Sequence, residues 1–389
     1  MQRQYFFIVP ILLVLLICTH ARLTEAQQLS RPSLITRRMN ISSTPNFQSW
    51  QLTDHSKRTQ TLMTQFAVPW NLNLALSSRT QVQLTQYHVR SDFQIGSVGD
   101  QADIERIDLQ GFGDVRAKLS HAVSDSFLIL VGASLPIGRR DLNRDESLVS
   151  AALFNQSLDF GVGRLGEGTA FDFGSGYVHS LSNATISLGA NYLYRGSYQK
   201  DHLTAISENP VYDPGQEFSL AAGIDVGKET FQFRSDAVYT YHTAETLDQQ
   251  NYFHQGPNLL LDTGLAYKKH RIQLEIFGQY LQHWSSRRPD LEGDFDILIR
   301  DLNNRLVYGI SANYRIGQRT SVFGSVSDKL IRTHDNRKFA AIRAYDLNLF
   351  CRIATGLGFT TGIKISDGQI KQRVNLTGLS TYATLTTGF

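Results

Sequence analysis

Histidine is the residue best suited to acid–base chemistry or metal binding, and this chain has 11 of them. His242 and His283 fall near the ends of predicted strands, where a hydrolase would need a serine or aspartate beside them. Acidic neighbours are expected there only by chance. The chain has no His-Glu-x-x-His motif, and Cys351 belongs to no metal-ligand motif. We therefore expect no catalytic site, no metal site and no cofactor.

A glycine-rich segment, Gly161-Val-Gly-Arg-Leu-Gly166, matches the G-x-G-x-x-G pattern of dinucleotide sites. Such a site needs a helix directly after the glycines, so that the phosphates meet the helix N-terminus. The residues that follow, Ala170 to Val178, alternate as a strand does. We interpret the segment as a glycine-rich loop and expect no nucleotide.

Charged side chains on the polar faces of predicted strands are the stronger functional candidates, because those faces would line the inside of a barrel. Both signs of charge occur, so strong ion selectivity is not expected. Two interpretations stay open: a constriction of mixed charge, or groups that neutralise one another across a plugged lumen. The candidate lumen-lining residues are Asp114, Arg116, Asp172, Arg271, Glu275, Asp346 and Lys364.

The strands that carry these residues are predicted from sustained alternation of apolar and polar side chains. It is clear over 185–195, 271–281 and 357–366, where one face is apolar and the other polar. Each run covers roughly ten residues, the length of a tilted strand that spans a bilayer. The fold class is therefore all-β: a transmembrane, antiparallel, up-and-down barrel.

Short turns and long loops alternate along the chain, as in outer-membrane barrels with periplasmic turns. With a first strand near 46–55 and a last strand over 376–389, the count is sixteen; fourteen is possible because the first strand is weakly patterned. A β-propeller would show similar spacing but would repeat a blade signature, which is missing here. The predicted turns are 77–80, 124–126, 182–185, 227–230, 268–270, 317–320 and 354–356. The predicted long stretches are 90–106, 137–168, 196–215, 243–257, 283–304, 331–338 and 367–374.

The N-terminus predicts export. Residues 1–26 contain Arg3, an apolar run and small residues before Gln27, as a cleaved signal peptide does. Residues 27–45 are polar and are predicted to be a flexible lead-in, so the barrel is assigned to 46–389. With 38 Lys+Arg against 35 Asp+Glu, the charge is balanced, and no nucleic-acid partner is expected.

The chain ends on an alternating strand whose last residue is Phe389. A strand with two usable edges needs a neighbour on each, because its backbone groups must be paired. In a barrel, the last strand meets the first. We expect Phe389 to be the signal that the barrel-assembly machinery reads.

Residues 111–198 resemble a known family. The matching segments are Gly111-Phe-Gly-Asp114, Leu135-Pro-Ile-Gly138, Gly168-Thr-Ala-Phe-Asp-Phe-Gly174 and Ser187–Arg195, which span roughly a quarter of the chain. They are similar to the outer-membrane family of the meta-pathway of phenol degradation type. The resemblance implies a barrel in the cell outer membrane and transport of apolar or aromatic compounds.

We expect an outer-membrane channel for passive uptake or efflux of small solutes, in contact with membrane lipid and lipopolysaccharide. A sixteen-strand lumen is wide enough for a solute unless a loop fills it. We expect loop 137–168 to fold partly into the lumen and rest near the strand that carries Asp172. The alternative is a barrel without transport, acting as a surface enzyme or as a structural or adhesive protein. The oligomeric state is left open.

Overall fold

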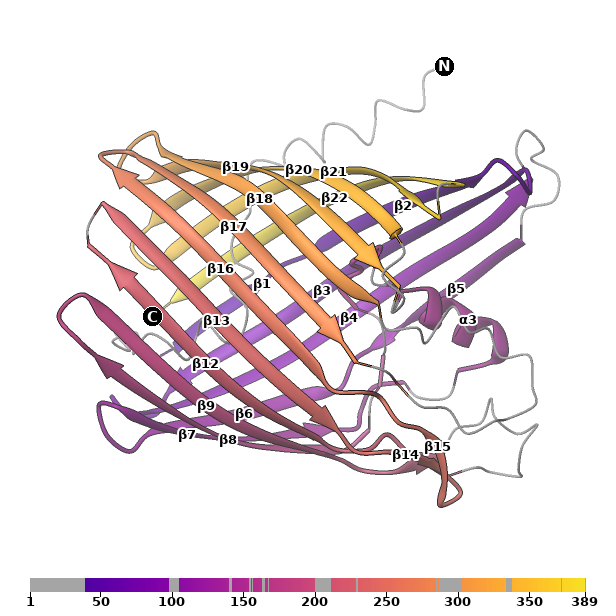
Figure 1. Ribbon diagram of the computed structural model, residues 1–389, viewed down its shortest axis with the longest axis horizontal. Helices are drawn as coiled ribbons and strands as arrows, with labels where there is room; N and C mark the ends of the chain where they lie inside the picture. Colours follow the sequence, from indigo (N-terminus) through magenta and orange to yellow (C-terminus); the bar gives the residue numbers. More distant parts are fainter. Residues whose placement is uncertain are drawn as a thin grey trace.

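The structure is a computed structural model in which most strands form one closed antiparallel sheet (Figure 1). It describes residues 39–97, 105–139, 142–153, 155, 157–162, 165–166, 168–199, 211–228, 230–284, 286, 303–333, 338–371 and 373–388. The predicted signal peptide and Phe389 lie outside these residues, so both stay predictions.

The elements follow one another around the barrel, apart from a helix and four short strands in the long loops. Their bounds are β1 (Met39–Ser43), β2 (Asn46–Asp54), β3 (Thr59–Ala75), β4 (Thr80–Ser97), β5 (Glu105–Phe112), β6 (Val115–Ala122), β7 (Phe127–Leu135), α3 (Arg144–Leu153), β8 (Ala170–Ser180), β9 (Ala184–Arg195), β10 (Tyr198–Gln199), β11 (Val211–Asp213), β12 (Glu217–Gly227), β13 (Phe231–His242), β14 (Glu245–Leu247), β15 (Gln250–Phe253), β16 (Asn258–Lys269), β17 (Ile272–His283), β18 (Asn304–Arg315), β19 (Thr320–Arg332), β20 (Lys338–Ala354), β21 (Leu357–Ile370) and β22 (Val374–Gly388).

The wall has sixteen strands, which confirms the predicted count. β1 and β2 act as one strand, because both pair with β22 on one edge and β3 on the other. β5 and β6 also act as one strand along β4. Their pairing register shifts by one residue at Gly113 and Asp114, which is the mark of a β-bulge.

Closure of the barrel depends on the first strand. The register against β22 is the same on both sides of Pro45, since Ser42 pairs with Thr386 and Asn46 with Tyr382. Pro45 has no N–H to donate, yet its carbonyl accepts the N–H of Ala383. The predicted lead-in of 27–45 is therefore too long: the wall already includes Met39–Ser43, ahead of the predicted boundary at 46.

All seven predicted short turns are confirmed, and they lie at one end of the barrel (Figure 1). The first strand starts and the last strand finishes at this same end, where Asn40 pairs with Gly388. The prediction that 90–106 is a long polar stretch between strands is wrong, because β4 runs to Ser97 and β5 begins at Glu105. Polar residues occur on the outer face here, where Arg106 bridges Asp92 and Asp108. The loops after β9 and β13 add a small second sheet of β10, β11, β14 and β15.

The two faces of the wall differ in chemistry. Alternate residues of each strand turn outward, and the large apolar ones among them are exposed. On a closed barrel, such a surface requires lipid, so the protein is an outer-membrane β-barrel, as predicted. The outward apolar residues include Phe66, Trp70, Leu119, Val131, Phe171, Phe173, Leu188, Phe218, Leu220, Phe233, Leu265, Ile276, Ile310, Tyr345, Leu347, Ile365, Leu379 and Leu385.

No helix in the described part of the chain is long and apolar enough to cross a membrane. The one helix of the loop between β7 and β8, α3, lies at the long-loop end of the barrel beside β5 (Figure 1).

At the closing seam, Trp50 of β2 lies opposite Gly378 of β22. A Cβ at Gly378 would lie 2.7 Å from two atoms of the Trp50 ring. A Cβ at Gly317 would have no neighbouring atom of the described residues within 4 Å. Overpacking of this kind costs roughly 1–3 kcal/mol. We expect Gly378→Ala to lower the urea midpoint for unfolding in detergent micelles and Gly317→Ala to leave it unchanged. Equal midpoints for the two variants would contradict this account of the seam.

Candidate functional site

The lumen wall carries most of the predicted charged residues. Arg116, Asp172 and Glu275 alternate with outward apolar residues of their strands, so they face inward. Asp346 and Lys364 face inward too, as direct partners across β20 and β21. Arg271 is different and corrects the prediction. It is exposed in the turn between β16 and β17, because the strand begins one residue later, at Ile272.

Asp114 holds the loop between β7 and β8 at both of its ends. Its two carboxylate oxygens accept the backbone N–H groups of Gly138, at 2.8 Å, and Gly168, at 3.2 Å. Asp114 is buried beside the β-bulge, which turns its side chain inward. A Cβ at Gly138 would lie 2.4 Å from the carbonyl oxygen of Leu165, so only glycine fits this closure. Asp114 thus anchors the loop, a more specific role than the predicted one of lining the lumen.

The described residues of 142–162, which we name the plug, begin with a well-capped helix. The side chain of Asn143 accepts the N–H of Glu146, and the Glu146 carboxylate accepts the N–H of Asn143. This reciprocal capping box satisfies two backbone donors that would otherwise be unpaired. Arg139 also donates to Glu146, at 2.8 Å. The start of α3 is therefore held by contacts within the loop itself.

Apolar packing fixes the helical part of the plug to the wall. Val149 and Leu153 of α3 are buried against Ala67, Val89 and Leu109 of β3, β4 and β5. Leu158, next along the plug, is fully buried in a second cluster with Trp50, Met63, Ile342 and Leu376. The expectation that loop 137–168 enters the lumen is thus confirmed for the described residues. Its resting place is a correction: these contacts are with β2–β5, β20 and β22, and not with the strand of Asp172.

Two glutamines bind the backbone of the plug beyond Leu158. Gln48 and Gln65 face inward as direct partners across β2 and β3. Gln48 donates to the carbonyl of Asp159, at 3.1 Å, and accepts the N–H of Gly161, at 2.8 Å. Gln65 donates to the carbonyl of Val162, at 2.7 Å, and accepts its N–H, at 3.0 Å. The side-chain amides thus provide the partners that a neighbouring strand would provide.

Asp159 makes the charged contact between the plug and the wall. Its carboxylate lies 2.7 Å from Lys329 Nζ and 3.9 Å from Arg305 Nη1. Lys329 also donates to the carbonyl of Ser157, at 2.8 Å. The left-handed φ of 50° at Asp159 is one that aspartate tolerates better than most residues. Burial acts to raise the pKa of Asp159, but Lys329, Lys364 and Arg305 together hold that pKa below its usual range.

A pair of aspartates lies on the neighbouring part of the lumen wall. Asp236 and Asp262 are direct partners across β13 and β16, and Arg234 lies 3.3 Å from Asp236 and 3.4 Å from Asp262. Gln279 connects this group to the plug, because it donates to Asp262, at 3.2 Å, and accepts from Arg305, at 3.0 Å. The paired aspartates of β13 and β16 and the cations of β18 and β19 are therefore close along the wall, with only β17 between them.

A histidine group lies where β12, β13 and β16 meet the long loops. Glu217 is in contact with Arg195 and lies 3.5 Å from Nδ1 of His242. Glu217 is thus an acidic neighbour of one of the two predicted rim histidines. Nε2 of His242 faces the side-chain amides of Gln255 and Asn258, at 3.1 and 3.0 Å. These described contacts include no serine hydroxyl that a hydrolase could use as its nucleophile.

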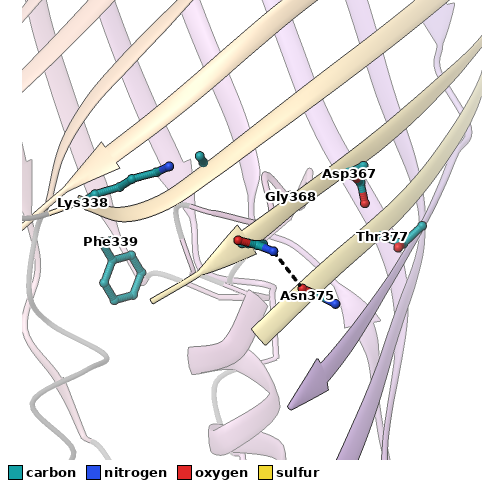
Figure 2. Close-up of a pocket in the computed structure, with 8 residues that line it drawn as sticks. Lys338, Phe339, Asp367, Gly368, Asn375 and Thr377 are labelled. Carbon is teal, nitrogen blue, oxygen red and sulfur yellow. Dashed lines mark hydrogen bonds between the residues drawn. The ribbon is translucent and has the colours of Figure 1, made fainter. Parts of the chain in front are cut away.

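A cavity of about 440 Å³ lies on the outer face of the wall, near the long-loop end (Figure 2). Its lining side chains, among them Asp367, Asn375 and Thr377, belong to the outward faces of β20, β21 and β22. Gln369 donates to Asn375 across it, at 3.3 Å. The cavity is therefore separate from the lumen.

Several residues central to this site were not singled out from the sequence. Each wall residue among them follows the alternation of its strand, so the sequence predicts that its side chain faces inward. The alternation does not indicate that these side chains contact a loop that is distant in sequence. The residues are Gln48, Gln65, Asp159, Arg234, Asp236, Asp262, Arg305 and Lys329.

No family model matches the sequence, and a search of curated proteins finds no relative. Among solved structures, OprB of Pseudomonas putida is similar over 93% of this chain and 97% of its own, with 10% identity and a TM-score of 0.49. OpdQ of Pseudomonas aeruginosa is similar over 90% and 98%, with 9% identity and a TM-score of 0.43. The CymD monoaromatic hydrocarbon channel is similar over 95% and 94%, with 9% identity and a TM-score of 0.42. Likenesses this weak say nothing about the solute of this chain.

The glutamine contacts predict how firmly the plug is held. Gln65→Leu removes two hydrogen bonds to Val162, together worth about 1–3 kcal/mol. We expect hydrogen exchange at the amides of 157–162 to become roughly tenfold to a hundredfold faster. Gln83→Leu is the control, because Gln83 faces the lumen and bonds to Asn71, away from the plug. Unchanged exchange in Gln65→Leu would show that these bonds do not hold the plug.

The lowered pKa of Asp159 predicts that plug docking depends on pH. A depressed pKa in the docked state means that stabilisation is present above the ordinary value of 3.8 and is lost as pH falls through the lowered value. We expect protection of the 157–162 amides, corrected for the intrinsic exchange rate, to be constant from neutral pH down to about 4 and then to fall. Asp159→Asn should show weaker protection without this acid step. The same step in both proteins would assign it to another carboxylate.

Proposed function

We propose that this protein is an outer-membrane channel through which small solutes diffuse passively, with a lumen narrowed by the plug. The observation that carries the proposal is the set of polar and charged contacts that residues 159–162 make with the lumen wall. Helix α3 is held by apolar contacts, which keep the loop inside the barrel. Residues 159–162 are held by side-chain amides and an ion pair in addition to the apolar packing of Phe160 and Val162. A polar or charged group of a solute can take over hydrogen bonds and ion pairs, whereas it cannot replace apolar packing.

The lining of the lumen also supports a water-filled path. Charged residues of both signs face inward on neighbouring strands, and Asp236 and Asp262 among them stay partly exposed. The sequence resemblance favours apolar or aromatic solutes, and the mixed charge argues against strong selectivity between simple ions. Diffusion down a gradient is the mechanism that this geometry supports.

The competing function is a barrel without transport, which includes a surface enzyme that uses the His242 and Glu217 group. Conductance of the purified protein in planar bilayers separates the two functions. A protein that gives neither conductance nor flux of sugars into liposomes would remove the channel proposal. Loss of a hydrolytic activity in His242→Ala would favour the enzyme.

The role of the plug can be tested by cross-linking it to the wall. A Cβ at Gly161 would lie 3.7 Å from Oε1 of Gln48, so Gln48→Cys and Gly161→Cys place two thiols within reach of a short thiol cross-linker. The native Cys351 is replaced by alanine to leave only this pair in the described chain. We expect cross-linking to lower liposome flux several-fold, and cleavage of the linker to restore it.

The single variant Gln48→Cys, treated with the same reagent, is the matched control and should keep its flux. Equal flux before and after cross-linking would show that displacement of residues 159–162 plays no part in permeation.

A further inference from the structure

We propose that Lys329, Arg305 and Lys364 form a binding site for the carboxylate of a small organic anion, which the plug occupies with its own Asp159. This inference rests on the proposed channel function and names the substrate class of the same lumen. The three cations come from β19, β18 and β21, so they converge from different strands of the wall. A carboxylate from the solute would take the place of the Asp159 carboxylate.

The geometry is that of a built anion site. Lys329 has a side chain only 9% exposed, and its Nζ lies 2.7 Å from one oxygen of Asp159. Arg305 Nη1 lies 3.9 Å from the other oxygen. Lys364 lines the same small cavity as Asp159 and Lys329. A buried ammonium needs a close counter-charge, so this position requires a carboxylate or a group of similar charge.

The charges at this position do not balance with Asp159 alone. Of the three cations, Lys364 has Asp346 as its direct strand partner. Lys329 and Arg305 share Asp159 on the side of the plug. The buried Nε of Arg305 has no hydrogen-bond partner among the described residues. An incoming anion therefore meets an excess of positive charge and an unused donor.

The body of the ligand can be inferred from the cavity beside Asp159. Its volume is about 50 Å³, little more than that of one water molecule, so a solute fits only where Asp159 withdraws. Its lining is apolar at Trp50, Val307 and Ile342, with hydroxyl groups at Ser327 and Ser366. Apolar and aromatic walls beside a cationic end suit a small carboxylate with an apolar or aromatic body.

Asp159 then acts as an internal competitor. While its carboxylate is bound, residues 159–162 remain against Gln48 and Gln65. A solute carboxylate that binds the same cations removes the charged contact of the plug. Binding of the anion and withdrawal of the plug are thereby linked, since both need the same site.

Benzoate and benzamide are suitable probes, because they have nearly the same size and differ in charge. Calorimetric titration of the purified protein in detergent should show benzoate binding at least about tenfold tighter than benzamide, as expected for a charge-assisted contact. Lys329→Met and Lys364→Met should each reduce benzoate affinity, Lys329→Met by about tenfold or more. Asp159→Asn should raise it, because the competing carboxylate is gone.

Lys268→Met is the matched control, since Lys268 faces the lumen but binds Gln232 near the short turns. Two lysine variants are used so that poor folding of one leaves the other as a test. Equal affinity for the two probes, or affinity unchanged in both Lys329→Met and Lys364→Met, would overturn the inference. Bilayer recordings in potassium chloride distinguish failure of the anion site from failure of the channel. A protein that conducts but does not prefer benzoate contradicts the anion site alone. A protein that does not conduct contradicts the channel.

Discussion

Every backbone N–H and C=O of a strand that crosses a bilayer must be paired inside the protein, because the lipid offers no partner. The remainder of this structure depends on that requirement. It is met where β1 and β2 lie between β3 and β22, so that the first and last strands share one ladder. The ladder keeps its register across Pro45, which cannot donate but still accepts from Ala383. Alternation of side chains then gives an apolar outer face and a polar inner face.

A closed wall of sixteen strands encloses more space than its own side chains fill. The loop between β7 and β8 occupies part of that space. The β-bulge at Gly113 and Asp114 turns one carboxylate inward, and this carboxylate holds both ends of the loop. Apolar contacts retain α3 and continue to Phe160 and Val162, while amides and an ion pair add polar contacts at residues 159–162. One loop thus combines apolar packing with hydrogen bonds and an ion pair to the same wall.

Charges of opposite sign lie close together along one part of the lumen wall. Asp236 and Asp262 belong to β13 and β16, and Arg305 and Lys329 belong to β18 and β19, with only β17 between the two groups. Gln279 of β17 joins them, since it donates to Asp262 and accepts from Arg305, which in turn lies near Asp159 of the plug. The plug carboxylate is therefore part of a polar network that continues along the wall.

The sequence by itself determined the barrel, the short turns and the inward face of each strand, and it favoured sixteen strands while leaving fourteen possible. These properties depend on the period of two along a strand and on turn residues, which are local. It did not determine that Arg271 lies in a turn, that 90–106 is mostly strand, or that the wall begins at Met39. Strand ends depend on pairing with neighbours and on where the wall leaves the lipid. Only the tertiary structure decided that Gln48, Gln65 and Lys329 meet residues 157–162, because contacts between distant segments have no period.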